Sequence, residues 1–227
     1  MLNKKTQQVL KSLLGVNNSM IVSKDMTVVD EFKTLLGKVN LGLLEDDIKE
    51  FGLYDAGGFL NAVSLLDDPT IELEENLLKI KDQNTSIEYV ITDLSALEDC
   101  VVDPEIIETT QNTSSVLDFE LTQEVLDKIK KASSVFKTSD ALYIISSGGK
   151  TTLKVATKES FVSSRNSFSI SIDASSEKDF ELPIPLENIM KIPSVGYTVS
   201  LKYNQERDAY RVVLSNEIYT FVFTLLD

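Results

Sequence analysis

The chain has 227 residues, of which 42% are hydrophobic and 26% charged, and its net charge at pH 7 is −14. This length allows one large domain or two of ordinary size, each with a hydrophobic core. The chain contains no histidine and a single cysteine, Cys100, which excludes intrachain disulfides and histidine-based nucleophile or metal sites. It has no phosphate-binding GxxxxGK[ST] loop, no signal-peptide pattern and no apolar run of the ~18 residues that a membrane span needs.

The first half has the pattern of a helix, several strands, a short helix and three more strands. Apolar residues at Val9, Leu10 and Leu13 predict a helix from Lys4 to about Val16. Asp55 can cap the short helix, whose apolar residues include Phe59. Strands are predicted at 20–23, 26–32, 70–74, 77–82 and 86–92, with further apolar stretches at 34–41 and 47–54.

Regular patterning fades between Thr92 and Ser115. This segment is acidic, contains Pro104 and ends in a cluster of Gln, Asn, Thr and Ser. Such composition is typical of a loop. We therefore expect a domain at 1–92, an interdomain connector at 93–115 and a second domain at 116–227.

The second half repeats the order of the first. A strand at 116–121 precedes a helix at 122–136, and Pro185 suits the first turn of a short helix in PLENIMKIP. Further strands are predicted near 141–146, 151–157, 167–173, 179–184, 195–203, 208–216 and 218–226. TQQVLKSLLG at 6–15 and TQEVLDKIKK at 122–131 also share Thr, Gln, Val and Leu at the same places. Two similar tandem α+β domains are the expected fold.

Lysines gather on these helices although the chain is acidic. On the helix at 122–136, Lys128, Lys130 and Lys131 lie opposite the apolar stripe that should pack on a sheet. An exposed lysine is usually only solvated, but helices turned toward one cavity would give a positive lining that holds a phosphate backbone without reading bases. The lysines expected to face DNA are Lys4, Lys5, Lys11, Lys128, Lys130, Lys131, Lys137 and Lys191.

At this point the sequence resembles the DNA sliding clamps, and most closely those of T-even-type phages. The resemblance is strongest at FGLYDAGGFLNAVSLLDDPTIEL, residues 51–73, and extends to the tandem domain order, the acidic connector and the final strand YTFVFTLLD. It implies a homotrimeric ring of six similar domains, with antiparallel sheets outside and helices lining a central hole.

The resemblance also implies a function. The ring would encircle duplex DNA without sequence specificity and tether a replicative DNA polymerase, in the cytoplasm of an infected bacterial host. A clamp-loader ATPase would be a partner, and the late-transcription machinery is a further candidate. No catalytic residue, cofactor or metal is implied. One departure is the short helix of the first domain, which offers neutral Asn61 and Ser64 where the second domain has Lys191.

Two surfaces follow from the resemblance. The pocket for partner peptides would be formed by apolar residues of the connector and the last strand: Ile106, Ile107, Tyr219, Phe221 and Leu225. The strands at 86–92 and 167–173 should be sheet edges that pair between neighbouring chains. Their interface residues would be Ile87, Tyr89, Ile91, Phe168, Ile170 and Ile172.

Two other functions remain open at the sequence level. A monomeric acidic interaction protein, such as a DNA mimic, would explain the net charge but gives the basic helices no role. An enzyme would have to use paired carboxylates such as Asp67 and Asp68, or Asp46 and Asp47, and adjacent acids in turns are usually solvated. The mass in solution separates a ring from a monomeric mimic.

Overall fold

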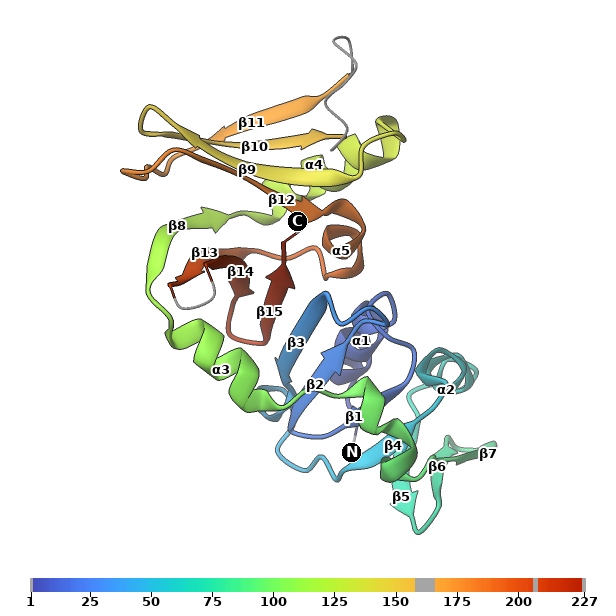
Figure 1. The fold of residues 1–227 in the computed structure, drawn as a ribbon. Helices are drawn as coiled ribbons and strands as arrows, with labels where there is room; N and C mark the ends of the chain where they lie inside the picture. The colour runs from blue at the N-terminus through green and yellow to red at the C-terminus, as the bar shows by residue number, and fades with distance from the viewer. Residues whose placement is uncertain (1, 158–165, 206–207, 226–227) are drawn as a thin grey trace. The chain divides into compact units, whose positions relative to one another are not determined.

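The computed structural model describes residues 2–157, 166–205 and 208–225, and the chain divides into two units (Figure 1). The first unit is Met1–Pro104 with Glu217–Tyr219, and the second is Glu105–Asn216 with Thr220–Asp227. Both contain a helix, four strands, a shorter helix and three strands, in that order. The repeated order predicted from the sequence is confirmed.

In the first unit, α1 (Lys4–Leu13) begins where the Asn3 side chain accepts a hydrogen bond from the Thr6 N–H, at 2.9 Å. The short helix α2 (Ala56–Val63) begins in the same way, because Asp55 accepts from the Gly58 N–H at 2.8 Å. This confirms the cap predicted at Asp55. The strands are β1 (Met20–Val22), β2 (Asp25–Val29), β3 (Leu35–Asn40), β4 (Phe51–Leu53), β5 (Thr70–Glu74), β6 (Leu77–Lys81) and β7 (Ser86–Val90), with the short 3-10 helix η1 (Leu41–Leu43) after β3.

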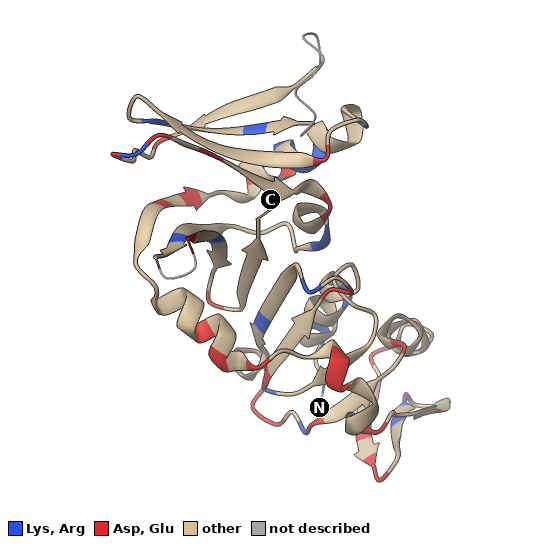
Figure 2. Cartoon of the chain, in the orientation of Figure 1, with Lys and Arg blue, Asp and Glu red and all other residues tan. Residues whose placement is uncertain are grey.

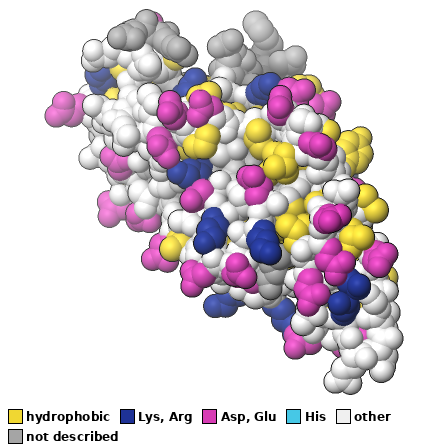
Figure 3. Space-filling model, turned by 90° about the horizontal axis from the view of Figure 1, so that it is seen from below, with side chains coloured by type: hydrophobic (Ala, Val, Ile, Leu, Met, Phe, Trp, Pro, Cys, Tyr) yellow, Lys and Arg dark blue, Asp and Glu magenta, His cyan; other side chains and the backbone are white. Residues whose placement is uncertain are grey.

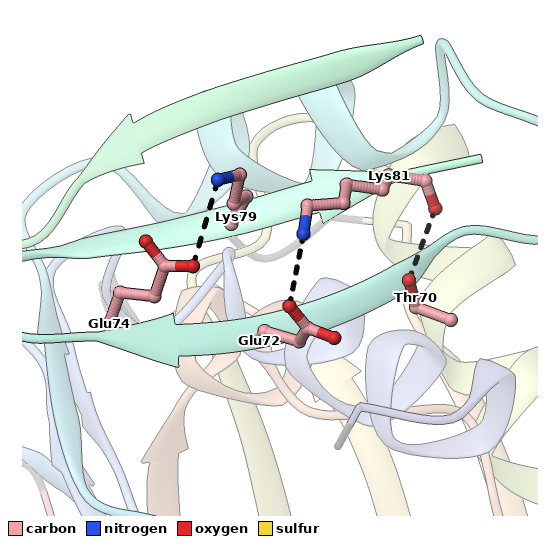
Figure 4. A network of polar contacts seen from close by, with 5 residues as sticks. All are labelled: Thr70, Glu72, Glu74, Lys79 and Lys81. Atoms are coloured by element: carbon pink, nitrogen blue, oxygen red, sulfur yellow. Dashed lines mark hydrogen bonds and ion pairs between the residues drawn. The ribbon is translucent and has the colours of Figure 1, made fainter. Parts of the chain in front are cut away.

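Antiparallel pairs organise this unit. β1 pairs with β4, β2 with β3, and β5, β6 and β7 form a three-stranded sheet in that order. The outer face of this sheet carries a ladder of charges: Lys81 Nζ lies 3.2 Å from Glu72 Oε2, and Lys79 Nζ lies 3.7 Å from Glu74 Oε1 (Figure 4). The opposite face supplies Ile71, Leu78 and Ile80 to the core.

In the second unit, α4 (Gln123–Val135) is capped by Thr122, whose hydroxyl accepts from the Val125 N–H at 3.3 Å. It buries Leu126, Ile129 and Ala132, as the apolar stripe predicts. The short helix is α5 (Leu186–Lys191), with Pro185 at its N-cap. The strands are β8 (Ser115–Leu121), β9 (Ala141–Ser147), β10 (Lys150–Ala156), β11 (Phe168–Ile172), β12 (Phe180–Pro185), β13 (Tyr197–Asn204), β14 (Ala209–Ser215) and β15 (Tyr219–Thr224).

Two antiparallel sets of strands form the second unit. One has the order β11-β10-β9-β12, and in the other β15, β14, β13 and β8 follow one another (Figure 1). Helix α4 contacts β10 and α5, and α5 contacts β9 and β12. The core includes Leu142, Ile144, Leu153 and Val155 on one face of the first sheet.

The repeat extends to strand pairing. The pair β1–β4 matches β9–β12, the pair β2–β3 matches β10–β11, and the sheet β5-β6-β7 matches β13-β14-β15. Equivalent helices make equivalent contacts, since α1 touches α2 and α4 touches α5. The two units are therefore two copies of one folding pattern.

The expectation of irregular structure between Thr92 and Ser115 is wrong. The segment contains a 3-10 helix, η2 (Leu94–Cys100), and an α-helix, α3 (Pro104–Asn112). Proline lacks an N–H, but the first turn of a helix leaves its N–H groups unbonded, so Pro104 starts α3 instead of breaking it. Among the described residues, no helix is long and apolar enough to cross a membrane.

Candidate nucleic-acid interface and sheet edges

The lysines of α4 are not equivalent. Lys128 and Lys131 are exposed, whereas Lys130 is half-buried. Lys128 Nζ lies 2.6 Å from Glu124 Oε1, one helical turn earlier, and this lysine lowers the pKa of the Glu124 carboxyl. Within the part of the chain that the structure describes, Lys131 forms no ion pair. Lys131 is therefore the residue on this helix whose charge is most available to an outside anion.

Lys130 is held inside the unit. Its Nζ donates a 2.5 Å hydrogen bond to the carbonyl oxygen of Ile192, the C-cap residue of α5. Burial lowers the pKa of Lys130, and the nearby Asp127 partly opposes this change. Lys191, on α5 itself, donates to Asn188 Oδ1 at 3.1 Å. Lys130 therefore connects α4 to the end of α5, whereas the bond from Lys191 lies within α5.

On α1, Lys4, Lys5 and Lys11 are exposed. Lys4 Nζ lies 3.0 Å from Asp68 Oδ1, and both side chains are exposed. Lys137, just beyond α4, is also exposed. Neither acidic partner was predicted from the sequence: the i, i+4 spacing could have revealed Glu124, but no local signal connects Asp68 with Lys4.

Charges of both signs share the visible surface. On the face shown in Figure 3, basic and acidic side chains alternate without a broad area of one sign. Figure 2 shows that α3 carries acidic residues, and these include Glu105 in its first turn. Any attraction to a polyanion must therefore come from particular helix faces, because the net charge is −14.

The residues predicted to bind partner peptides differ in exposure. Ile106 is 44% exposed, whereas Ile107, its neighbour on α3, is fully buried. Tyr219 and Phe221 are buried, and Leu225 is half-buried. The Tyr219 hydroxyl lies 3.2 Å from Ser12 Oγ, and burial raises its pKa. Of the five, Ile106 is the one that presents an apolar side chain to solvent.

The structure places β7 and β11 at sheet edges. β7 is the last strand of β5-β6-β7, and β11 is the first of β11-β10-β9-β12. Ile87, Tyr89, Ile91, Phe168, Ile170 and Ile172 are all half-buried. The Tyr89 hydroxyl donates to the Asp55 carbonyl oxygen at 2.7 Å, and its ring contacts Phe59 edge-on, with centroids 5.5 Å apart. The edge positions predicted for both segments are confirmed, while their pairing between chains stays a prediction.

Known proteins that are similar to this chain include a phage sliding clamp and several clamps of known structure. No protein-family model matches the chain. The sliding clamp of Vibrio phage KVP40 is 26% identical over 203 residues, which is 88% of this chain and 89% of that protein.

Solved structures with a similar fold include several clamps. The proliferating cellular nuclear antigen of Entamoeba histolytica superposes with a TM-score of 0.67 at 14% identity, covering 97% of this chain and 94% of that one. The equivalent protein of Thermococcus kodakaraensis gives a TM-score of 0.65 at 13% identity, covering 98% and 96%. The Helicobacter pylori beta clamp gives 0.63 at 13% identity, covering 98% of this chain and 63% of that longer one. The chain therefore has the fold of the DNA sliding clamps, and its sequence similarity to a phage member over most of its length confirms the resemblance predicted from the sequence.

Proposed function

We propose that this protein is a sliding clamp that encircles duplex DNA and tethers a replicative DNA polymerase, raising its processivity in phage DNA replication. The observation that carries the proposal is the coincidence of two likenesses along one chain: a clamp fold over 97% of its length and a phage clamp sequence over 88%. The DNA mimic gains no support, because the similar proteins are clamps. The work of such a protein is mechanical, and it acts as a scaffold without a catalytic residue.

The proposed ring contains three chains. Each chain supplies two domains, 1–92 and 116–227, joined by the connector 93–115, so six domains close a ring of three subunits. β7 and β11 are free to act as the complementary edges because each ends a sheet in its own unit. Edge pairing supplies main-chain hydrogen bonds and a defined register. In this ring the helices line the hole and the sheets form the wall.

Contact with DNA is proposed for the exposed lysines of α1 and α4. Lys5, Lys11, Lys131 and Lys137 are exposed, and among the described residues none of them forms an ion pair. Lys4 and Lys128 each have an acidic neighbour, so their charge is partly neutralised. A few mobile ammonium groups attract phosphates without fixing one position, which suits sliding.

Partner docking is proposed near α3. A Helicobacter pylori beta clamp structure contains a DNA ligase peptide, and A. fulgidus PCNA binds the C-terminal region of FEN-1. By analogy, a peptide of the polymerase or of a clamp-loader ATPase would dock here, and the late-transcription machinery is a further candidate. The protein would act in the cytoplasm of an infected bacterium. Ile106 is the exposed apolar contact that the structure offers.

Primer extension tests the proposal. On a primed circular template, the polymerase and clamp loader from the same source should make much longer products per binding event when this protein is added. The increase should vanish when the loader is omitted, because a closed ring must be opened to enter a circle. Product lengths that do not depend on the protein would contradict the proposed function.

A further inference from the structure

We infer the register of the contact between neighbouring chains: β7 of one chain pairs antiparallel with β11 of the next, Glu88 lies opposite Ser169, and Lys154 reaches across Ser169 to form an ion pair with Glu88. This inference rests on the proposed ring. It specifies which of several registers the two edges adopt and which side chains select it.

The edge strands β7 and β11 lack the usual protection against pairing with another chain. Edge strands normally carry prolines, charges or a covering segment. β12, the other edge of the β11 sheet, contains Pro183 and Pro185, and β2 is covered where the Thr27 hydroxyl donates to the Val102 carbonyl oxygen at 2.9 Å. β11, with sequence FSISI, has neither a proline nor a charge, and β7, with sequence SIEYV, has one charge, Glu88.

Negative and positive side chains alternate across the sheet β5-β6-β7. Lys79 lies between Glu72 on β5 and Glu88 on β7 in the strand register, and it forms its ion pair with Glu74 (Figure 4). Glu88 is exposed and, among the described residues, has no cationic partner. The row of charged side chains Glu72, Lys79 and Glu88 therefore ends at the sheet edge with the Glu88 carboxylate, which has no cationic partner among the described residues.

The matching positive charge lies on β10, the strand next to β11. Lys154 on β10 is paired in register with Ser169 on β11, and within the described residues its ammonium forms no ion pair. Strands are about 4.8 Å apart, so a residue on a strand added to β11 has its Cα roughly 10 Å from that of Lys154. The serine between them is small, so a lysine and a glutamate of ordinary length can meet above it.

The internal repeat supports the same register independently of the charges. In the β6–β7 hairpin, the last residue pair before the loop is Lys81 with Ser86, and in the equivalent β14–β15 hairpin it is Ser215 with Thr220. Ser86 is therefore equivalent to Thr220 in the repeat, and Asn84, two residues earlier, is equivalent to Ile218. β2 and β10 both start after a two-residue connection, so their first residues, Asp25 and Lys150, are equivalent in the repeat. Asp25 lies opposite Asn40 on β3, and the β10–β11 register, continued by one residue, places Lys150 opposite Asp173. Asn40 therefore matches Asp173.

Within the first unit, the Asn40 N–H donates to the Ile218 carbonyl oxygen at 2.8 Å. The equivalent bond joins Asp173 of one chain to Asn84 of the next. Antiparallel continuation from this pair sets Ser86 opposite Ser171 and Glu88 opposite Ser169, which is the register that the charges select. It also sets Ile87 opposite Ile170 and Tyr89 opposite Phe168, apolar pairs of the kind that stabilise sheets.

Disulfide trapping tests the register directly. In a Cys100→Ser background, Ser86→Cys with Ser171→Cys should give intermolecular disulfides, because directly opposite residues have Cα atoms about 4.5–5.5 Å apart. The matched controls Ser86→Cys with Ser169→Cys, and Ser86→Cys with Asp173→Cys, are displaced by two residues and should not cross-link. Cross-linking in a control pair instead, in a protein that assembles, would overturn the register.

Charge exchange tests the ion pair. Glu88→Lys and Lys154→Glu should each weaken assembly about two- to fivefold in the dissociation constant of an interface, and the double variant should recover most of this loss. Glu88→Lys combined with Lys150→Glu, a control on the same strand, should not recover. Equal recovery with both partners, or none with Lys154→Glu, would overturn the pairing. A wild-type chain that stays monomeric at every concentration would instead overturn the ring itself.

Discussion

At the residue scale, two adjacent lysines of α4 have different surroundings. Lys130 donates to the Ile192 carbonyl oxygen, while Lys131 is exposed. Lys130→Met should lower the free energy of unfolding by about 1 kcal/mol, because it removes a hydrogen bond from a partly buried carbonyl. Lys131→Met should change it by less than about 0.5 kcal/mol. Urea unfolding measures both.

DNA binding should show the opposite order. Lys131→Met should weaken attraction to duplex DNA more than Lys130→Met, since the ammonium of Lys130 already has a partner in its own unit. If Lys130→Met leaves stability unchanged and weakens DNA binding as much as Lys131→Met, the hydrogen bond to Ile192 does not hold that side chain.

Two adjacent isoleucines of α3 provide a second residue-scale prediction. Ile107 is fully buried, so Ile107→Ala should cost about 2–5 kcal/mol of stability. Ile106 is 44% exposed, so Ile106→Ala should cost much less but should weaken binding of a fluorescent clamp-binding peptide from the polymerase. Thermal unfolding and fluorescence anisotropy separate the effects. Peptide affinity that is unchanged in Ile106→Ala would move the docking surface away from α3.

At the scale of elements, helix faces should act through summed charge. Lys128→Ala with Lys131→Ala should flatten the plot of log binding constant against log salt by up to about 1.8, which corresponds to two phosphates at about 0.9 each. Adding Lys4→Ala and Lys11→Ala should flatten it further. Glu124→Gln should act in the opposite direction, because it releases Lys128 from its ion pair. Equilibrium titration of a short duplex over a range of salt concentrations measures the slopes.

A slope that is unchanged in the quadruple variant would mean that α1 and α4 do not face the DNA. Thermal stability serves as the control. All four lysines are exposed, so their removal should leave the melting temperature nearly unchanged.

Local patterns were enough to predict most elements. The apolar stripe of Val125, Leu126 and Ile129 predicts α4, and alternation predicts β7 and β11, because burial of one face imposes these periods. The connector helix α3 was missed because it is short and buries only Ile107 and Thr110, a signal too weak for a periodicity argument. Pro104 contributed to the composition that predicted a loop, whereas in the structure it starts α3.

Contacts between residues that are far apart in the sequence could not be predicted from it. Two examples are the ion pair of Lys4 with Asp68 and the hydrogen bond of Lys130 to Ile192. Both depend on how elements pack, and no local sequence spacing predicts them. The difference between Ile106 and Ile107 likewise depends on which side of α3 packs inward. The sequence therefore predicted which helices are basic, but not which of their lysines are free.

At the scale of the whole molecule, the proposed function requires a closed ring around DNA. The two units repeat one pattern, and the chain has free edges at β7 and β11. A ring holds DNA by topology, so its retention should depend on whether the DNA has free ends and only weakly on salt. A protein held by charge alone would be released as salt rises.

The most direct measurement threads the protein onto linear duplex DNA at micromolar concentration, blocks both ends with bulky protein caps and washes in high salt. An encircling ring should remain on capped DNA and be lost within the same wash when a restriction enzyme cuts that DNA between the caps. Loss from capped DNA in high salt, or retention that is the same before and after cutting, would contradict the encircling ring.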